Sequence, residues 1–359
     1  MVQYTFRRVL LAIPVVFAIM AVTFILARSI PGDPCKAILG EKASAETCER
    51  FTREHGLDQP IPVQFGIYLQ NLAKGDLGDS IRFGRPVLLI MIERLPTTIE
   101  LGMAAMTIAV VVGIPLGIIA AVKRNSPVDV GVMIGANLGV SLPVFFLGLL
   151  LIYVFAVLLK DTPFALPPSG RIPAGMVATP FYEVYDIAVE EGTPKFYFLE
   201  FFANLYIFNS IITANWEVLQ GTTRHLILPA IALSTIPLAI IARITRSSML
   251  EVLGLDYVRT ARAKGVPANR VISKHAFRNA LLPVVTIVGL QLGAILGGAV
   301  LTETILGFAG VGLSVFEAIT ARDFPIIQGF VIIIAIIYVS FNLIVDLSYG
   351  FLDPRIRLD

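Results

Sequence analysis

The chain has 359 residues, of which 56% are hydrophobic and only 15% are charged. Soluble domains average about 45–50% apolar and about 25% charged residues, so this composition excludes an ordinary soluble protein and indicates a polytopic membrane protein. The net charge of +2 excludes nucleic-acid binding driven by a large basic field. Two Cys and three His also exclude a zinc domain built on several such ligands.

Six stretches are apolar and long enough for a membrane-spanning helix, which needs about 20 mostly apolar residues. The first follows Arg7 and Arg8, as a signal peptide would, but its 19 uncharged residues exceed a typical signal core and no small-residue cleavage site follows it. We therefore predict an uncleaved membrane anchor. In chain order the predicted spans are residues 9–27, 99–122, 130–159, 226–242, 281–301 and 326–347.

The distribution of basic residues predicts the orientation of these spans. Segment 243–278 carries eight Lys or Arg residues against two acidic residues, and the positive-inside rule places it in the cytoplasm together with Arg7 and Arg8. An even number of crossings must separate the two regions. The aromatic stretch 196–216 is therefore predicted not to cross but to form a helix at the outer membrane surface. The resulting topology has six helices with both termini inside.

This topology divides the chain into seven parts. They are the first span 1–28, an extracytoplasmic cap segment 29–98, the second and third spans 99–159, a second extracytoplasmic segment 160–225, the fourth span 226–242, a cytoplasmic loop 243–280, and the last two spans with a cytoplasmic tail 281–359. The cap segment contains a helix-like stretch at 45–55. Cys35 and Cys48 both lie in it, so an oxidising exterior would favour a disulfide between them, with two unpaired thiols as the alternative.

The centres of the predicted spans lack ionisable residues. Glu100 and Asp346 lie near the ends of their spans, where we expect solvated or capping carboxylates. No phosphate-binding loop, His-Glu-x-x-His or Gly-x-Ser-x-Gly motif is present, so we predict a protein with no catalytic, cofactor-binding or metal-binding residues. The glycines at 307, 310 and 312 predict a tight turn or half-inserted loop between the last two spans.

Glycines recur every four residues within two spans, which predicts faces where another helix approaches closely. They are Gly113 and Gly117 in the second span and Gly289, Gly293 and Gly297 in the fifth. Ordinary internal packing is the alternative to a moving, pore-forming bundle.

The cytoplasmic loop contains a short amphipathic helix that begins at Asp256 and that Gly265 and Pro267 end. Tyr257, Val258 and Ala261 share one face, and basic side chains occupy the rest. Such a helix can insert into a groove on a soluble partner. The alternative is a basic loop that only sets the orientation or touches anionic lipid.

Several motifs resemble one protein family. They are DYVRTARAKGVPANRVISKHAFRNALLPVV in the cytoplasmic loop, FRRVLLAIPV, IPGDP and GDLGDS before it, and LTETILGFAGVG and LIVDLSYGFLDPRIR after it. The chain is similar to inner-membrane permease subunits of binding-protein-dependent ABC importers, in the dipeptide/oligopeptide/nickel group, and looks closest to dipeptide permeases. The resemblance covers residues 1–359 apart from the middle of the second extracytoplasmic segment.

The resemblance implies an all-α, type I ABC importer transmembrane fold in a bacterial or archaeal inner membrane. It also implies a second, homologous permease subunit, an extracytoplasmic substrate-binding protein and two cytoplasmic ATPase subunits that hold ATP and Mg²⁺. The cytoplasmic loop would be the coupling loop that docks into the ATPases. Its coupling residues would be Asp256, Tyr257, Val258, Arg259, Ala261, Arg262, Lys264 and Gly265.

The resemblance favours short peptides as the cargo. Nickel complexes or oligosaccharides are alternatives within the family, and a stand-alone channel or secondary carrier is an alternative of a different class. Peptides are polar, so we expect the path to be lined by the polar residues Ser141, Thr286 and Gln291, which lie in apolar runs. Hydrogen bonds between helices are the alternative role for these side chains.

Overall fold

The computed structural model describes all residues except 1, 30–34, 37–39, 41–42, 55 and 353–359. The described residues form helices joined by loops, and the only strand-like pairing among them is a single bridge between Asp79 and Pro86. The long helices are α1 (Val2–Ser29), α5 (Val87–Val122), α11 (Trp216–Leu253), α14 (Arg278–Leu306) and α16 (Phe324–Leu352). The shorter helices are α3 (Ala45–Glu54), α4 (Ile61–Ala73), α6 (Pro127–Ser141), α7 (Val144–Ile152), α8 (Phe181–Val184), α9 (Pro194–Ala203), α10 (Tyr206–Ile212), α12 (Asp256–Ala263), α13 (Ala268–Arg270), α15 (Val311–Ala321) and the π-helical turns η1 (Tyr153–Leu158) and η2 (Val271–Phe277).

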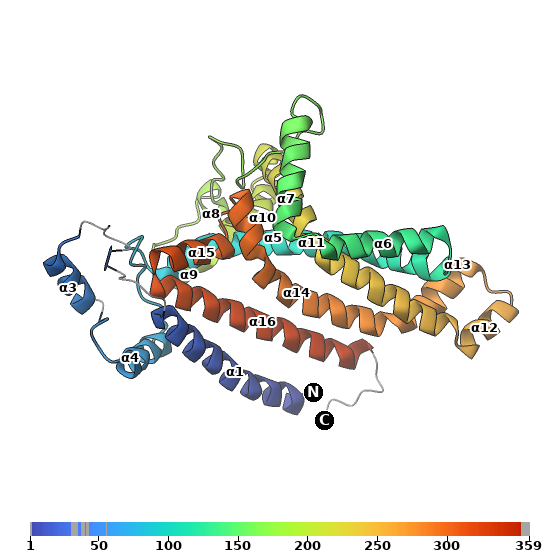
Figure 1. The fold of residues 1–359 in the computed structure, drawn as a ribbon, viewed down its shortest axis with the longest axis horizontal. Helices are drawn as coiled ribbons and strands as arrows, with labels where there is room; N and C mark the ends of the chain where they lie inside the picture. The colour runs from blue at the N-terminus through green and yellow to red at the C-terminus, as the bar shows by residue number, and fades with distance from the viewer. Residues whose placement is uncertain (1, 30–34, 37–39, 41–42, 55, 353–359) are drawn as a thin grey trace.

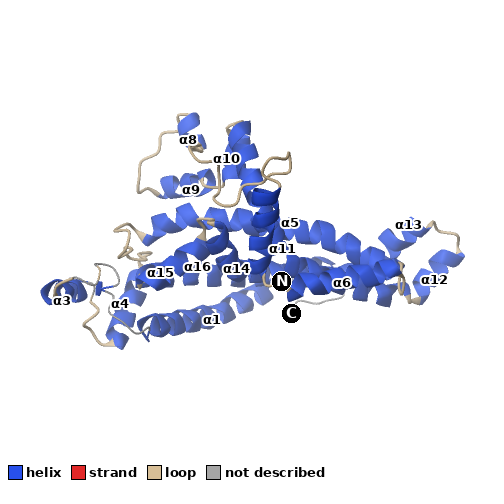
Figure 2. Cartoon of the chain, turned by 45° about the horizontal axis from the view of Figure 1, so that its top comes forward, coloured by secondary structure: helices blue, strands red, loops and turns tan. Residues whose placement is uncertain are grey.

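The long helices lie roughly along one axis, with α3 and α4 at one end of the molecule and α12 and α13 at the other (Figure 1). Helices α5, α11 and α14 form the centre, and α16 packs between α14 and α1. Helices α8, α9 and α10 gather on one side of the bundle, away from α1 (Figure 2). The predicted cytoplasmic loop and the predicted cap therefore lie at opposite ends.

Three apolar clusters hold the bundle along its length. The central cluster joins α5, α11 and α14 through Leu101, Leu233 and Ile295. A second cluster, at the cap end, packs the start of α5 against α15 and α16. A third, at the opposite end, packs the ends of α5 and α11 against α12, η2 and the start of α14.

Four of the five glycines at four-residue spacing lie at close helix approaches. A Cβ at Gly117 would lie 2.6 Å from the carbonyl oxygen of Ala242, and one at Gly113 would lie 2.9 Å from that of Leu238. These two positions set the α5–α11 distance. Gly289 and Gly293 likewise face Val345 and Tyr338 of α16, whereas no atom lies within 4 Å of the position that a Cβ would take at Gly297.

Five helices are long and apolar enough to cross a membrane, and two bent helix pairs would raise the number to seven if each is one span. Over the predicted span 130–159 the helix is broken, because α6 and the α7–η1 helix meet at 99°. Pro143 causes the break. It excludes the α conformation at the residue before it, and Leu142 is extended, with φ −80° and ψ 125°.

The prediction of one helix over 196–216 is also wrong. Helix α9 ends at Ala203, α10 covers only Tyr206–Ile212, and Trp216 already begins α11. Asn204 ends α9, and its side-chain amide donates to the Glu200 carbonyl. Asn215 caps α11 by accepting a hydrogen bond from the Val218 amide, so the chain starts a new helix where the aromatic run suggested continuity.

In the cap segment, α3 corresponds to the helix-like stretch that the sequence indicates, and His55 lies outside the described residues. Cys35 and Cys48 form a disulfide with their Cα atoms 5.4 Å apart. Helix α4 attaches to the anchor α1 through aromatic contacts, with the ring of Phe65 5.0 Å from that of Phe24. Helix α4 of the cap segment therefore contacts the C-terminal half of α1.

Candidate coupling surface

The loop after α11 makes a sharp turn on each side of α12. Leu255 is extended and starts the helix, which Gly265 ends with a left-handed φ of +74°. The Gly265 amide donates to the Arg262 carbonyl, and the Val266 amide donates to the Ala261 carbonyl. A glycine is favoured at such a position because L side chains are strained there. The short helix that Gly265 ends is thus present as the sequence predicts.

The apolar face of α12 packs inside the chain, which differs from the prediction that it meets a partner. Val258 has no exposed surface and Ala261 is buried, both against Met249 and Val271. The physical reason is that α12 is folded back between α11 and η2, so these two side chains complete the third apolar cluster. Tyr257 points outward instead, and its hydroxyl accepts a hydrogen bond of 2.8 Å from the Asn279 amide.

The exposed face of α12 and the turn after it therefore form the candidate coupling surface. We use this name for Asp256, Tyr257, Arg259, Arg262, Lys264 and Gly265, all of which are exposed. Three of the six are basic, and Arg259 forms an exposed ion pair of 3.4 Å with Asp256. This face can offer charge and one aromatic ring to a partner, but no continuous apolar patch.

A recess beside the coupling surface supplies apolar area. It has a volume of ≈ 310 Å³, and its lining includes Arg262, Val266, Val271 and Ile272. A partner side chain that enters this recess would contact both α12 and the last turn of α11, which contributes Leu253. The geometry thus combines basic side chains with a small apolar socket.

A buried ion pair fixes α6 to α11 behind this surface. Arg246 donates two hydrogen bonds to Asp129, at 2.6 and 2.7 Å, and Asp129 is almost fully buried. The Asn125 amide also donates to this carboxylate. Arg246 lies seven residues before the end of α11, so the helix that leads into α12 is joined to α6 close to the coupling surface.

The three polar residues expected along the path come from two helices. Ser141 is exposed at the end of α6, while Thr286 and Gln291 are half-buried on α14. The Ser141 hydroxyl donates to the Asn137 carbonyl and the Thr286 hydroxyl to the Leu282 carbonyl, each within its own helix. Hydroxyls satisfied in this way need no partner on another helix, and their lining of a path stays a prediction.

Glu303, near the end of α14, is a buried carboxylate that the sequence analysis missed. It has no exposed surface, and its carboxylate accepts hydrogen bonds from the Thr98 hydroxyl at 2.6 Å and the Gly312 amide at 2.7 Å. It thereby caps the N-terminus of α15, which turns back from α14 by 83°. The motif LTETILGFAGVG contains both this glutamate and the glycines that make room for it. A Cβ at Gly310 or Gly312 would collide with the carboxylate.

Glu100 corrects a second expectation. The sequence places it at the start of a span, but α5 begins thirteen residues earlier, at Val87, and Glu100 is buried. It forms an ion pair of 2.7 Å with Arg171 and accepts from the Ile207 amide in the first turn of α10, so it is not solvated, and the helix that it caps is not its own. The Arg171 guanidinium also lies over the Tyr206 ring, so this pair fastens segment 160–225 to α5.

Asp323 is a further buried carboxylate, after Glu303 and Glu100, that joins separate segments of the chain. Its carboxylate accepts from the Ser80 hydroxyl at 2.5 Å and from the Arg82 amide at 3.1 Å, and it is fully buried at the junction of α15 and α16. The motif GDLGDS therefore ties the cap segment to α16. Within the described ranges, no group of three or more His, Cys, Asp or Glu side chains could hold a metal ion.

Outside the bundle, the second extracytoplasmic segment has its own polar contact. The Tyr182 hydroxyl donates to the Glu200 carboxylate at 2.6 Å, which joins α8 to α9. Burial, together with this negative partner, raises the pKa of the Tyr182 hydroxyl above its ordinary value.

Comparison with known proteins decides the family. Residues 113–358 match the family described as "Binding-protein-dependent transport system inner membrane component", and residues 1–102 match its N-terminal companion. The chain belongs to this family. Membership confirms the all-α type I importer fold and a multi-pass location in the bacterial inner membrane, and it confirms the resemblance to ABC importer permeases.

Named relatives of this inner membrane component cover its full length. "Dipeptide transport system permease protein DppB" of Alkalihalophilus pseudofirmus is 44% identical over 357 residues, which are 99% of this chain and 100% of the relative. The protein of the same name from Escherichia coli is 43% identical, with 99% of each chain covered. "Di/tripeptide transport system permease protein DppB" of Pseudomonas aeruginosa is 42% identical, again over 99% of each. The chain is thus a transport component, whose family name implies further subunits and a binding protein.

Proposed function

We propose that the chain is the pore-forming permease subunit of an ATP-driven importer that passes short peptides from an external binding protein across the inner membrane. The observation that carries this proposal is the identity of 42–44% over the full length with relatives named for dipeptide or di/tripeptide transport. Identity over the whole chain includes every helix and both extracytoplasmic segments, which supports a shared cargo class as well as a shared fold.

The transporter would contain a second homologous permease subunit, two cytoplasmic ATPases and the binding protein. This chain would bind no cofactor and catalyse no reaction, because ATP and Mg²⁺ would sit on the ATPases. The coupling surface supports this arrangement: its basic side chains and aromatic ring are exposed at the end of the molecule opposite the cap. ATP-driven movement of the ATPases would act on α12 and, through it, on α11 and α14.

A test of the cargo uses the complete transporter in proteoliposomes with the binding protein on the outside. We expect ATP-dependent uptake of a labelled dipeptide, and no uptake with an ATPase variant that cannot hydrolyse ATP. Nickel complexes and oligosaccharides are offered as competing cargo. Peptide uptake without ATP would indicate a channel or secondary carrier, and uptake of only a competing cargo would contradict the peptide assignment.

A test of the coupling surface reverses one exposed charge. We expect Arg262→Glu to weaken ATPase association about tenfold, because a repulsive charge would face the partner. Lys123→Glu is the matched control, since Lys123 is also exposed and basic at the same end but follows α5. Pull-down of the ATPase subunits and stimulated ATP hydrolysis are measured. Equal behaviour of the two variants would argue against docking at α12.

A further inference from the structure

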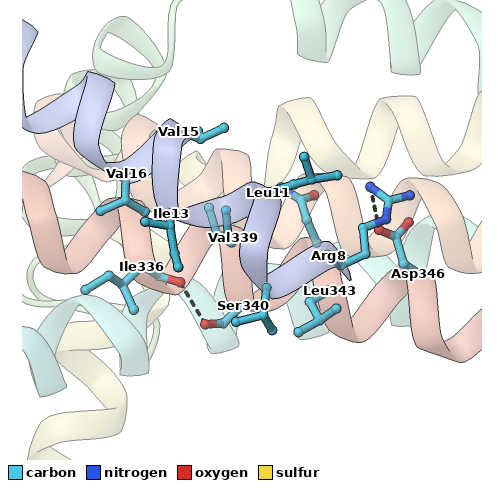
Figure 3. A pocket seen from close by; sticks show the side chains of 13 residues that line it. Arg8, Leu11, Ile13, Val15, Val16, Ile336, Val339, Ser340, Leu343 and Asp346 are labelled. Atoms are coloured by element: carbon cyan, nitrogen blue, oxygen red, sulfur yellow. Dashed lines mark hydrogen bonds and ion pairs between the residues drawn. The ribbon is translucent and has the colours of Figure 1, made fainter. Parts of the chain in front are cut away.

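A groove runs between α1 and α16 at the periphery of the helix bundle. Its volume is ≈ 400 Å³, within the range of about 300–1,000 Å³ that is usual for small-ligand sites. Apolar side chains of both helices form its walls, among them Leu11, Val15, Ile336, Val339 and Leu343 (Figure 3). The polar lining is confined to Arg8, Ser340, Asn342 and Asp346.

The charged end of this groove is an ion pair. Arg8 and Asp346 lie 3.2 Å apart, and their side chains are 49% and 20% exposed (Figure 3). Ser340 adds little polarity, because its hydroxyl donates to the Ile336 carbonyl of its own helix. The groove is therefore amphipathic along its length, with one cation and one anion at one end and hydrocarbon along the rest.

The depth of the groove matches one leaflet of a bilayer. Arg28, whose guanidinium lies over the Phe24 ring, marks the other end of α1, twenty residues from Arg8. At 1.5 Å per residue this separation is about 30 Å, which equals the hydrocarbon thickness of a bilayer. The groove extends from Arg8 only to Val16, about 12 Å. It thus begins at one membrane surface and ends near the middle.

The chemistry of the charged end selects among amphiphiles. A phosphate would accept hydrogen bonds from the Arg8 guanidinium, and a primary ammonium would donate to the Asp346 carboxylate. A headgroup that carries both charges pairs with both side chains at once. A glycerol headgroup offers Asp346 no cation, and a choline headgroup offers it no N–H donor.

We propose that this groove binds one phosphatidylethanolamine molecule of the inner leaflet. Its phosphate lies at Arg8, its ammonium at Asp346, and one acyl chain lies along Leu11, Val15 and Val339. A helix of another subunit fits less well, because a spanning helix would follow α1 across both leaflets and would cover the half-exposed ion pair. The proposal does not depend on which cargo the transporter carries.

The first test measures which lipid stays bound. The transporter is purified intact, reconstituted in nanodiscs that contain equal parts of phosphatidylethanolamine, phosphatidylglycerol and phosphatidylcholine, and analysed by native mass spectrometry. We expect one retained phosphatidylethanolamine per chain. Loss of one charge-assisted hydrogen bond in Asp346→Asn should reduce the preference over phosphatidylglycerol about tenfold. Val339→Phe, which fills the groove, should release the lipid altogether.

Two matched controls keep this test specific. Arg7→Gln removes a neighbouring exposed cation that does not line the groove, and Val22→Phe enlarges an exposed side chain in the other half of α1. Both should retain the lipid. Size-exclusion profiles of all variants confirm that the complex is intact. Equal retention of phosphatidylglycerol by the unaltered chain, or equal loss in the controls, would overturn the proposal.

The second test identifies the occupant directly. A photo-crosslinking amino acid replaces Leu11, and the complex is irradiated in membranes that contain phosphatidylethanolamine. An adduct with the mass of that lipid supports the proposal, with Val22 as the control position. An adduct with another polypeptide would overturn it and would assign the groove to a subunit interface.

Discussion

Glu303 is fully buried, and both oxygens of its carboxylate accept hydrogen bonds. Burial of an ionised group is costly unless it is paired or fully hydrogen-bonded. The donors here are the Thr98 hydroxyl of α5 and the first amides of α15, so three helices meet at this one side chain. A negative charge at a helix N-terminus is also stabilised by the helix dipole.

Removal of this carboxylate should therefore destabilise the protein. We expect Glu303→Ala to lower the melting temperature, because each buried donor that it leaves without a partner costs about 1–3 kcal/mol. Glu317→Ala is the control on α15 itself, where an exposed pair with Arg82 at 3.6 Å contributes at most about 1 kcal/mol. Thermal unfolding of the purified complex measures both. Similar melting temperatures for the two variants would show that Glu303 does not hold α15.

Buried carboxylates were the residues least accessible to sequence reasoning. Glu100 was expected near the membrane surface because its neighbours before residue 99 are less apolar, yet the same helix continues back to Val87. Its partner Arg171 is 71 residues away, and nothing local to either residue indicates the pair. The disulfide was easier to predict from the sequence, since Cys35 and Cys48 are the only two cysteines in the chain.

At the level of helices, the apolar runs predicted where helices lie but not where they end. Hydropathy predicted residues 226–242, whereas α11 covers Trp216–Leu253. The additional turns are polar on one side and pack on the other, with Val218 and Met249 buried, so they escape a measure of apolarity alone. Pro143 lies in the middle of the run 130–159, where a proline is expected to kink a helix and where α6 and α7 meet at a bend.

The α5–α11 contact gives the second prediction. We expect Gly117→Ala to destabilise the complex, since its Cβ would lie 2.6 Å from the backbone oxygen of Ala242 and must push the two helices apart. Gly135→Ala in α6 is the control, because no atom lies within 4 Å of its Cβ position. A melting temperature that falls by several degrees only for Gly117→Ala is the expected result. Unchanged stability of that variant would mean that the close approach is not needed.

Helix α12 gives the third prediction, which separates its role in folding from its proposed role in docking. Ala261 is buried in the third apolar cluster, so Ala261→Glu places an unpaired charge there and should lower the melting temperature. Arg262→Glu, on the exposed side of the same helix, should leave the melting temperature unchanged while it weakens ATPase association. A comparison of thermal unfolding and pull-down for both variants tests this. Equal loss of stability in both would contradict the packing of α12.

At the level of the whole molecule, the orientation in the membrane remains a prediction from charge. The native cysteines are joined in a disulfide, so single introduced cysteines give a low labelling background. We expect Lys264→Cys to react with an impermeant maleimide only from the cytoplasmic side, and Lys195→Cys only from the outside. Labelling of intact cells and of inverted vesicles measures this. Reaction of both positions from the same side would overturn the predicted topology.

Helix α11 has a mechanical consequence. Its 38 residues form one unbroken helix of about 57 Å, nearly twice the thickness of the hydrocarbon core. One end leads directly into α12, and the other begins beside the second extracytoplasmic segment. This helix packs against α5 both in the central cluster and, near α12, in the third cluster. We expect a displacement of α12 by a few ångströms to be transmitted along α11 as far as Pro237 and Pro229, where a proline allows the helix to bend.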